Sequence, residues 1–166
     1  MKFQLFDVNT RIMVEIGIFA ALYAALVLVL APISFWVLQF RVADTLLSLV
    51  VRRKHLIIAF TIGTALGNIV SPFGILEITW MPFINILGGL SAYYIGKIFK
   101  NDFVAFVVGG VVYALWISFG VAIMLFLLLG IPLLPLFVYI LIPSLILIVG
   151  ASPVMKKVND IMGKEK

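Results

Sequence analysis

Residues 31–48 read Ala31-Pro-Ile-Ser-Phe-Trp-Val-Leu-Gln-Phe-Arg-Val-Ala-Asp-Thr-Leu-Leu-Ser48, and this stretch interrupts a succession of apolar runs. It places Gln39, Arg41 and Asp44 between hydrophobic residues. Charged groups within a membrane are costly and usually face the bundle interior or a water-filled cavity. If the rest of the chain lies in a membrane, we expect this stretch to form part of a binding site on its outer side.

The composition indicates a membrane protein. Hydrophobic residues make up 64% of the chain and charged residues 11%, against roughly half and a quarter in soluble domains. A soluble domain of this length could not bury so much apolar surface, so lipid must cover it. The first apolar run is followed by many more, which predicts a membrane span and not a cleaved signal peptide.

Six apolar runs predict helices that cross the bilayer, a crossing that takes about 20 residues. Proline, glycine and polar residues separate the runs. The predicted helices cover about residues 10–31, 40–51, 55–70, 76–99, 103–129 and 134–155. We therefore expect an all-α integral membrane protein, a compact bundle of six transmembrane helices that forms one domain over residues 1–166.

The basic residues predict how the bundle is oriented. Every lysine and arginine except Arg41 lies near the start of the first helix, near the end of the last, or around the turns after the second and fourth. Six crossings place these segments on one side, which the positive-inside rule assigns to the cytoplasm. Both termini are thus predicted to be cytoplasmic. Because the basic residues follow this topology, we interpret the net charge of +5 as a topology signal and expect no nucleic-acid partner.

Arg41 and Asp44 are predicted to lie deep in the membrane. They are three residues apart, so they share one face of an α-helix. Arg41 lies about 16 Å of α-helix from Arg52, and the hydrocarbon core is about 30 Å thick. Both charges therefore fall near the middle of the membrane or in its outer half.

Other polar and aromatic residues fall at similar depth when the outer ends of the helices are aligned. With Arg41 and Asp44, the candidate ligand-binding residues are Phe35, Gln39, Asn68, Glu77, Trp80, Asn85 and Trp116. Converging carboxylates, amides and aromatic rings are typical of a pocket for a small planar molecule that forms hydrogen bonds.

Structural roles remain open for the same residues. Arg41 and Asp44 can form an ion pair that only fixes helix packing. Glu77 can lie idle in the headgroup region, and Asn68 can bridge helices. The tryptophans can be interface anchors, the usual role of a lone tryptophan in a membrane protein.

The first helix carries two overlapping Ala-x-x-x-Ala pairs, Ala20 with Ala24 and Ala21 with Ala25. Small residues at this spacing let another helix approach closely. That helix belongs either to a partner subunit or to this protein itself.

The chain offers little for catalysis. It has no cysteine, so it can form neither a disulfide nor a thiolate metal site. It also lacks a His-Glu metal pattern and a Walker phosphate loop. We expect no enzyme activity, no metal site and no cofactor, and active transport would need an external ATPase.

Three motifs carry a resemblance to a known family: Ala31-Pro-Ile-Ser-Phe35, Gln39-Phe-Arg-Val-Ala-Asp44, and Gly63 followed by Asn68-Ile-Val-Ser-Pro-Phe-Gly74. They resemble the QueT family, over about the first four helices. Its members are substrate-binding (S) components of energy-coupling factor (ECF) transporters linked to uptake of queuosine precursors. The resemblance implies a six-helix multi-pass protein of a prokaryotic plasma membrane. It also implies that the alanine strip docks on an EcfT-like transmembrane subunit, whose two associated ATPases supply energy.

The chain departs from the family at both carboxylates. It has Asp44 where QueT-like sequences usually have Glu, and Glu77-Ile-Thr-Trp80 where they have Asp and a glycine-containing stretch. In a 7-deazaguanine site, one carboxylate would accept both N–H groups of the base edge and the other would pair with an aminomethyl cation. The alternatives are an S component for a different metabolite or vitamin, a solitary carrier without ATPases, and a structural scaffold.

Overall fold

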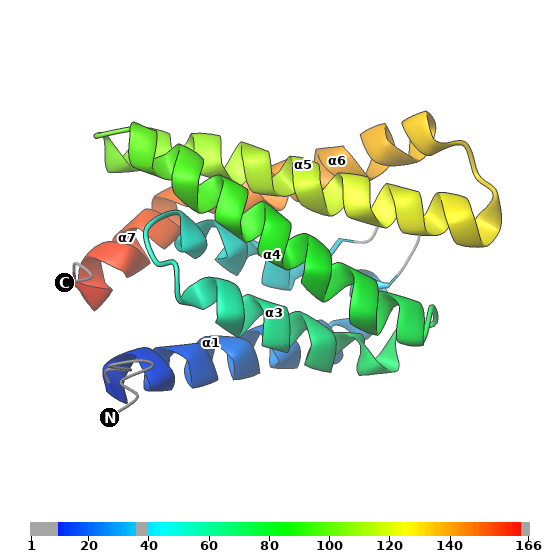
Figure 1. Ribbon diagram of the computed structural model, residues 1–166, viewed down its shortest axis with the longest axis horizontal. Coiled ribbons are helices and arrows are strands. Elements are labelled where there is room, and N and C mark those ends of the chain that lie inside the picture. The colour runs from blue at the N-terminus through cyan, green and yellow to red at the C-terminus, as the bar shows by residue number, and fades with distance from the viewer. Residues whose placement is uncertain (1–9, 36–39, 164–166) are drawn as a thin grey trace, which may run out of the picture.

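A computed structural model of the protein describes residues 10–35 and 40–163 (Figure 1). Over these residues the chain forms helices and short turns only, which confirms the prediction of an all-α protein. The α-helices and the two 3₁₀ helices, η1 and η2, are in chain order α1 (Thr10–Val29), α2 (Ala31–Ser34), η1 (Val42–Val51), α3 (Leu56–Gly67), η2 (Asn68–Val70), α4 (Ile75–Ile98), α5 (Asp102–Leu129), α6 (Leu133–Gly150) and α7 (Ser152–Met162).

Four helical segments among the described residues are long and apolar enough to cross a membrane: α1, α4, α5 and the α6–α7 run. Helix η1 and the α3–η2 run are apolar but shorter. Large apolar side chains, such as those of Val29 and Leu127, are exposed on the outer surfaces of the long helices. Exposed apolar surface of this extent indicates a membrane contact, so the chain is a multi-pass membrane protein.

Two predicted helices are divided where glycine and proline occur. The first α-helix ends at Val29 and not at residue 31, and Pro32 lies in the first turn of α2. The last helix breaks after Gly150, and Pro153 lies in the first turn of α7. Proline lacks a backbone N–H and fits best in the first turn of a helix, so each proline starts a new helix.

Helix η1 lies in the middle of the bundle and contacts α1, α3, α4, α5, α6 and α7 (Figure 1). The prediction of an α-helix over residues 40–51 is wrong in the type of helix and in its first residue. Helix η1 is a 3₁₀ helix that begins at Val42, and the backbone of Arg41 is extended. A 3₁₀ helix rises about 2.0 Å per residue, so the distance along the axis from Arg41 to Arg52 is about 22 Å instead of 16 Å.

Helices α1 and α3 approach closely through two glycines. A Cβ atom at Gly63 would lie 2.9 Å from the backbone oxygen of Ala20, and one at Gly67 would lie 2.9 Å from Cβ of Val27. Any larger residue would push the helices apart. Both glycines therefore serve packing within the bundle.

The two described ends of the chain lie at the same end of the bundle as the η1–α3 and α4–α5 turns (Figure 1). We call this the terminal end. The turns before α4 and α6 lie at the opposite end, which we call the loop end. Gly74 (φ 61°) and Gly130 (φ 67°) supply the positive φ of these two turns, a conformation that glycine adopts without steric cost.

Candidate ligand-binding site

Arg41 forms a buried ion pair with a residue far along the chain. Its Nη2 lies 2.6 Å from Oε1 of Glu77, and the two side chains are 5% and 0% exposed. Arg41 is the N-cap residue of η1, and Glu77 lies in the first turn of α4. The ion pair weighed between Arg41 and Asp44 is not the one observed, because among the described residues Glu77 is the carboxylate within ion-pair distance of Arg41, although Asp44 lines the same cavity.

Glu77 is held by the turn that precedes α4. Ser71 donates a hydrogen bond from Oγ to Oε2 of Glu77 and accepts one from the backbone N of Phe73 at 3.1 Å. Asn68 donates from Nδ2 to the backbone oxygen of Glu77 at 3.2 Å, so it bridges two elements. The alternative of an idle Glu77 in the headgroup region is wrong, because the side chain is buried and bonded on both oxygens.

Two further buried groups bond across helices near this pair. The hydroxyl of Tyr23 on α1 donates to Oδ1 of Asp44 on η1 at 2.6 Å. Asn85 on α4 donates from Nδ2 to Oγ1 of Thr64 and accepts from the hydroxyl of Tyr113 at 3.1 Å. We call Tyr23, Arg41, Asp44, Glu77 and Asn85 the Arg41 cluster.

A small cavity lies within the Arg41 cluster. Its volume is about 10 Å³, close to the least that one water molecule requires. The lining residues are Tyr23, Arg41, Asp44, Met81, Asn85, Ile117, Val121, Ile140 and Ser144. Phe35, just after α2, lies with its ring centroid 5.3 Å from the guanidinium carbon of Arg41, so an aromatic face borders the charged group.

Comparison with known proteins identifies the family. A family model described as the QueT transporter matches residues 13–160. The chain belongs to the QueT transporter family. No curated protein and no solved structure matches the chain. The match includes the whole Arg41 cluster, and membership makes this chain a transport protein rather than an enzyme.

The structure brings several predicted residues of this QueT chain together. Phe35, Arg41, Asp44, Glu77 and Asn85 meet at the cluster or its border. Their role in ligand binding stays a prediction. Asn68 does not line the cavity, and it contacts the cluster through a hydrogen bond to the backbone oxygen of Glu77. Gln39 lies outside the described residues.

The two predicted tryptophans serve to join α4 to α5. Trp80 donates from Nε1 to the backbone oxygen of Gly120 at 2.8 Å, and Trp116 donates to Oγ of Ser91 at 3.1 Å. Neither lines the cavity. Trp116 instead borders an apolar hollow with Val112, Leu115, Phe119 and Phe137. Each indole N–H is thus used between neighbouring helices, and a role of the two rings in ligand binding stays a prediction.

Three residues at or beside the cavity, Tyr23, Thr64 and Ser144, were not predicted from the sequence. Tyr23 is a lone polar ring inside an alanine-rich run, and that contrast is a signal that could have identified it. Thr64 and Ser144 carry no comparable signal. Hydroxyls in helices commonly bond to their own backbone, as Ser144 does to the oxygen of Ile140 at 2.9 Å.

The alanine strip of α1 is split between two faces. Ala20 and Ala24 are buried, each 6% exposed, and Ala21 and Ala25 are exposed. Ala20 and Ala24 lie on the inward face of α1 with Tyr23, which fits the alternative of packing within this protein, and a partner contact of the strip stays a prediction. Gly17 continues the exposed face one turn earlier, with open space around its Cα.

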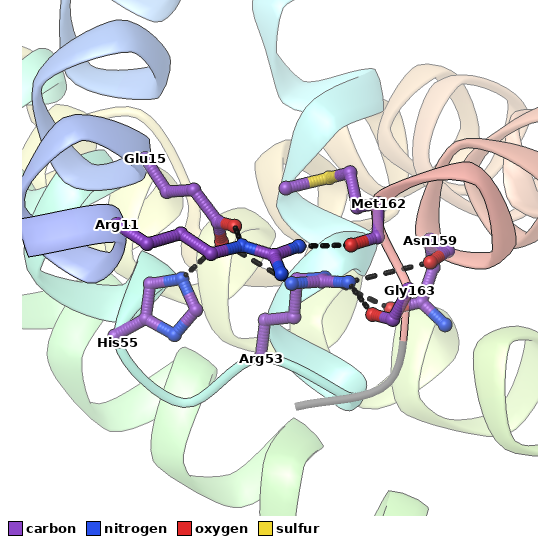
Figure 2. Close-up of polar contacts among 7 residues, drawn as sticks. All are labelled: Arg11, Glu15, Arg53, His55, Asn159, Met162 and Gly163. Carbon is purple, nitrogen blue, oxygen red and sulfur yellow. Dashed lines mark hydrogen bonds and ion pairs between the residues drawn. The ribbon is translucent and has the colours of Figure 1, made fainter. Parts of the chain in front are cut away.

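A second polar group, the Arg53 cluster, lies at the terminal end and consists of Arg11, Glu15, Arg53, His55 and Asn159 (Figure 2). Glu15 on α1 lies 3.2 Å from Nη1 of Arg53, 2.9 Å from Nε2 of His55 and 2.9 Å from Nε of Arg11. Arg53 also donates to Oδ1 of Asn159 at 3.0 Å, to its backbone oxygen at 3.3 Å, and to the backbone oxygen of Gly163.

The Arg53 cluster fastens the last helix to the rest of the bundle. Arg11 donates to the backbone oxygen of Met162, so two arginines bind carbonyls at the end of α7 (Figure 2). The last carbonyls of a helix lack partners within it and carry partial negative charge. The cluster therefore has a structural explanation that needs no ligand.

Proposed function

We propose that this QueT chain is the substrate-binding S component of an ECF transporter in a prokaryotic plasma membrane. The observation that supports this most is the Arg41 cluster. It places a phenol group from α1, charged groups from η1 and its N-cap, and an amide from α4 around one cavity, in a chain of a transporter family. Ionisable groups inside a membrane protein are usually functional.

We propose that the chain crosses the membrane six times as one domain, with η1 and the α3–η2 run as the two short crossings. The terminal end would then face the cytoplasm. Its basic residues support this orientation, since Arg11, Arg52, Arg53 and Lys100 all lie on helix ends or turns there, and lysine and arginine concentrate on cytoplasmic segments. The Arg41 cluster would lie toward the outside, where substrate is captured.

The charges of the cluster favour a cationic ligand. Arg41 contributes one positive charge and Asp44 and Glu77 one negative charge each, so the formal sum is −1. Because Arg41 is paired with Glu77, Asp44 is the carboxylate left without a cation within ion-pair distance among the described residues. A 7-deazaguanine with an aminomethyl group would supply that cation and present N–H groups to the carboxylate and amide oxygens.

Binding requires the cluster to open. Pockets for small molecules usually measure about 300–1,000 Å³, and the cavity measures about 10 Å³. The side chains of the cluster bond to one another, so a ligand of ordinary size would have to displace some of these contacts. An entering ligand would replace the Asn85–Thr64 hydrogen bond with its own, while Tyr23 keeps its bond to Asp44 and holds that carboxylate in place.

Thermal unfolding of the purified protein tests the ligand class. A 7-deazaguanine with an aminomethyl group should raise the melting temperature, because a ligand that binds only the folded state stabilises it. The same base with a neutral substituent should raise it less. Equal shifts would contradict the charge argument. No shift with either base would favour an S component for another metabolite.

We propose that Ala21 and Ala25 dock on the EcfT-like subunit, whose two ATPases power uptake. Replacing both with leucine should leave ligand binding intact and prevent co-purification with that module, since bulky side chains block close helix approach. Replacement with serine, which stays small, is the matched control and should preserve assembly. Assembly of the leucine variant, or substrate flux into liposomes that contain this chain alone, would contradict the proposal.

A further inference from the structure

Helices α3 and α4 lie side by side (Figure 1), and a groove runs between them. Its volume is about 640 Å³, and it shares no lining residue with the cavity of the Arg41 cluster. The lining residues are Lys54, His55, Ile57, Ile58, Thr61, Ile62, Ile86 and Leu90. The last two belong to α4, and the others to α3 and the turn before it. We call this hollow the α3–α4 groove.

The α3–α4 groove has an apolar surface. The two helices pack closely beside it, since a Cβ atom at Gly89 would lie 3.0 Å from Cγ1 of Ile57. Ile58 and Ile62 expose their apolar side chains next to this contact. The hydroxyl of Thr61 donates to the backbone oxygen of Ile57 at 2.7 Å, so its hydrogen is already bonded. An apolar partner therefore fits the groove.

One end of the groove carries a cation. Lys54 lies in the turn before α3, at the terminal end, and it is exposed. Its Nζ lies 5.8 Å from the ring centroid of Tyr94, an exposed residue of α4. Tyrosine and lysine are typical of the headgroup level of a membrane, which places this end of the groove at the membrane surface.

The length of the groove matches one leaflet of a bilayer. Lys54 and Ile62 are eight residues apart, or about 12 Å at the rise of an α-helix. A hydrocarbon core is about 30 Å thick, so one leaflet contributes about 15 Å. The groove thus leads from a cation at the membrane surface to apolar side chains near the middle of the membrane.

We propose that the α3–α4 groove binds an acyl chain of an anionic phospholipid whose phosphate lies at Lys54. An ammonium group forms charge-assisted hydrogen bonds to phosphate, and basic residues beside transmembrane helices attract anionic headgroups. The chain would lie between Ile62 of α3 and Ile86 of α4. A helix of another protein would also cover these apolar side chains, but only an anionic lipid accounts for the cation at the surface end.

Native mass spectrometry of the full chain in detergent tests the headgroup, with phosphatidylglycerol and phosphatidylcholine as probes. The anionic lipid should bind about fivefold more tightly, the effect expected of one basic residue at the surface. Lys54→Gln should remove this preference, and Lys54→Arg should keep it. Lys157→Gln is the matched control, because it removes an exposed lysine outside the groove, and it should leave the preference unchanged.

Filling the groove tests the acyl chain. Ile62→Trp should weaken the binding of both lipids about tenfold, the effect of losing roughly two buried methylene contacts. Leu66→Trp is the matched control. Leu66 lies one turn further along α3, outside the groove, and is 46% exposed against 44% for Ile62. Both changes are on the surface, and thermal unfolding in the same detergent checks that both variants fold.

The two sets of variants can each overturn the proposal. Equal binding of the two lipids to the wild type, or equal effects of Lys54→Gln and Lys157→Gln, would show that Lys54 does not select the headgroup. Unchanged lipid binding by Ile62→Trp would show that no acyl chain occupies the groove. If Ile62→Trp removed a dimer or a partner subunit and left lipid binding intact, a protein helix would be the occupant. None of these results depends on the substrate of the Arg41 cluster.

Discussion

The Arg41 cluster and the Arg53 cluster contain similar residues, yet their bonding partners differ. Each pairs a buried arginine with a glutamate from another helix. In the Arg41 cluster, the bonds of Arg41, Asp44 and the Asn85 amide end on other side chains. In the Arg53 cluster, three bonds end on backbone oxygens at the end of α7.

This difference indicates which cluster can exchange partners with a ligand. A side chain can rotate away and leave its hydrogen-bonding capacity to a substrate. A backbone carbonyl cannot leave without moving its helix. Buried polar residues in a membrane protein are therefore insufficient to identify a binding site. A cluster whose polar groups bond to other side chains can bind a ligand, whereas one whose groups bond to backbone oxygens stabilises the fold.

The largest expected effect is on stability, at Arg53. Arg53→Met removes the buried cation that Glu15 and the carbonyls of α7 share, and it leaves Arg11 and His55 beside Glu15. A buried charge left fully unpaired costs about 3–5 kcal/mol, so with these two partners remaining the free energy of unfolding should fall by up to about 3 kcal/mol. Chemical unfolding in detergent measures it, with Lys157→Met, an exposed change on the same helix, as the control.

Substrate affinity of the Arg53→Met protein completes this test. The account predicts an unchanged dissociation constant for the protein that remains folded. A loss of binding at unchanged stability would mean that the Arg53 cluster takes part in the site, and the comparison would fail.

The ion pair of the Arg41 cluster should be dispensable for folding. Replacing a whole buried pair with apolar residues of similar volume is often neutral or stabilising by about 1–4 kcal/mol. Arg41→Met with Glu77→Leu should therefore unfold no more easily than the wild type, and it should lose substrate binding. Glu77→Leu alone, which leaves Arg41 unpaired, should be much less stable.

A double variant as unstable as Glu77→Leu alone would show that the pair holds the fold. The two clusters would then have the same role, contrary to the account. The same unfolding measurement distinguishes these outcomes.

A smaller effect is expected at Tyr23, which orients Asp44. Tyr23→Phe removes one hydrogen bond to a charged group, worth about 1.5–3 kcal/mol. Because Asp44 then has no fixed orientation before substrate arrives, we expect affinity to fall about tenfold with the fold intact. Isothermal titration calorimetry measures the change. An unchanged affinity would remove Tyr23 from the site.

The helices could be predicted from the sequence because their signals are local. Apolar runs end at Gly74 and Gly130, and both positions adopt the positive φ that favours glycine. The 3₁₀ form of η1 could not be predicted, because it depends on packing. The side chain of Val51 lies so close to Gly96 and Gly109 that a Cβ at either glycine would approach it within 2.5 Å.

The site could be predicted in part. The unusual polarity of Arg41, Asp44 and Glu77 is visible in the sequence, and the structure brings the three together. Which carboxylate pairs with Arg41 depends on how η1 meets α4, and no local pattern encodes that contact. The same limit applies to the alanine strip, since spacing does not tell whether Ala20 or Ala21 faces inward.

One calorimetric comparison tests the central claim most directly. Asp44→Asn and Glu15→Gln each remove one carboxylate charge, from the Arg41 and Arg53 clusters respectively. With an aminomethyl 7-deazaguanine as the probe, the account predicts a loss of affinity of about 100-fold for Asp44→Asn, since a hydrogen bond to a charged group contributes up to about 3 kcal/mol. It predicts wild-type affinity for Glu15→Gln. Wild-type affinity for Asp44→Asn, or equal losses in the two variants, would contradict it.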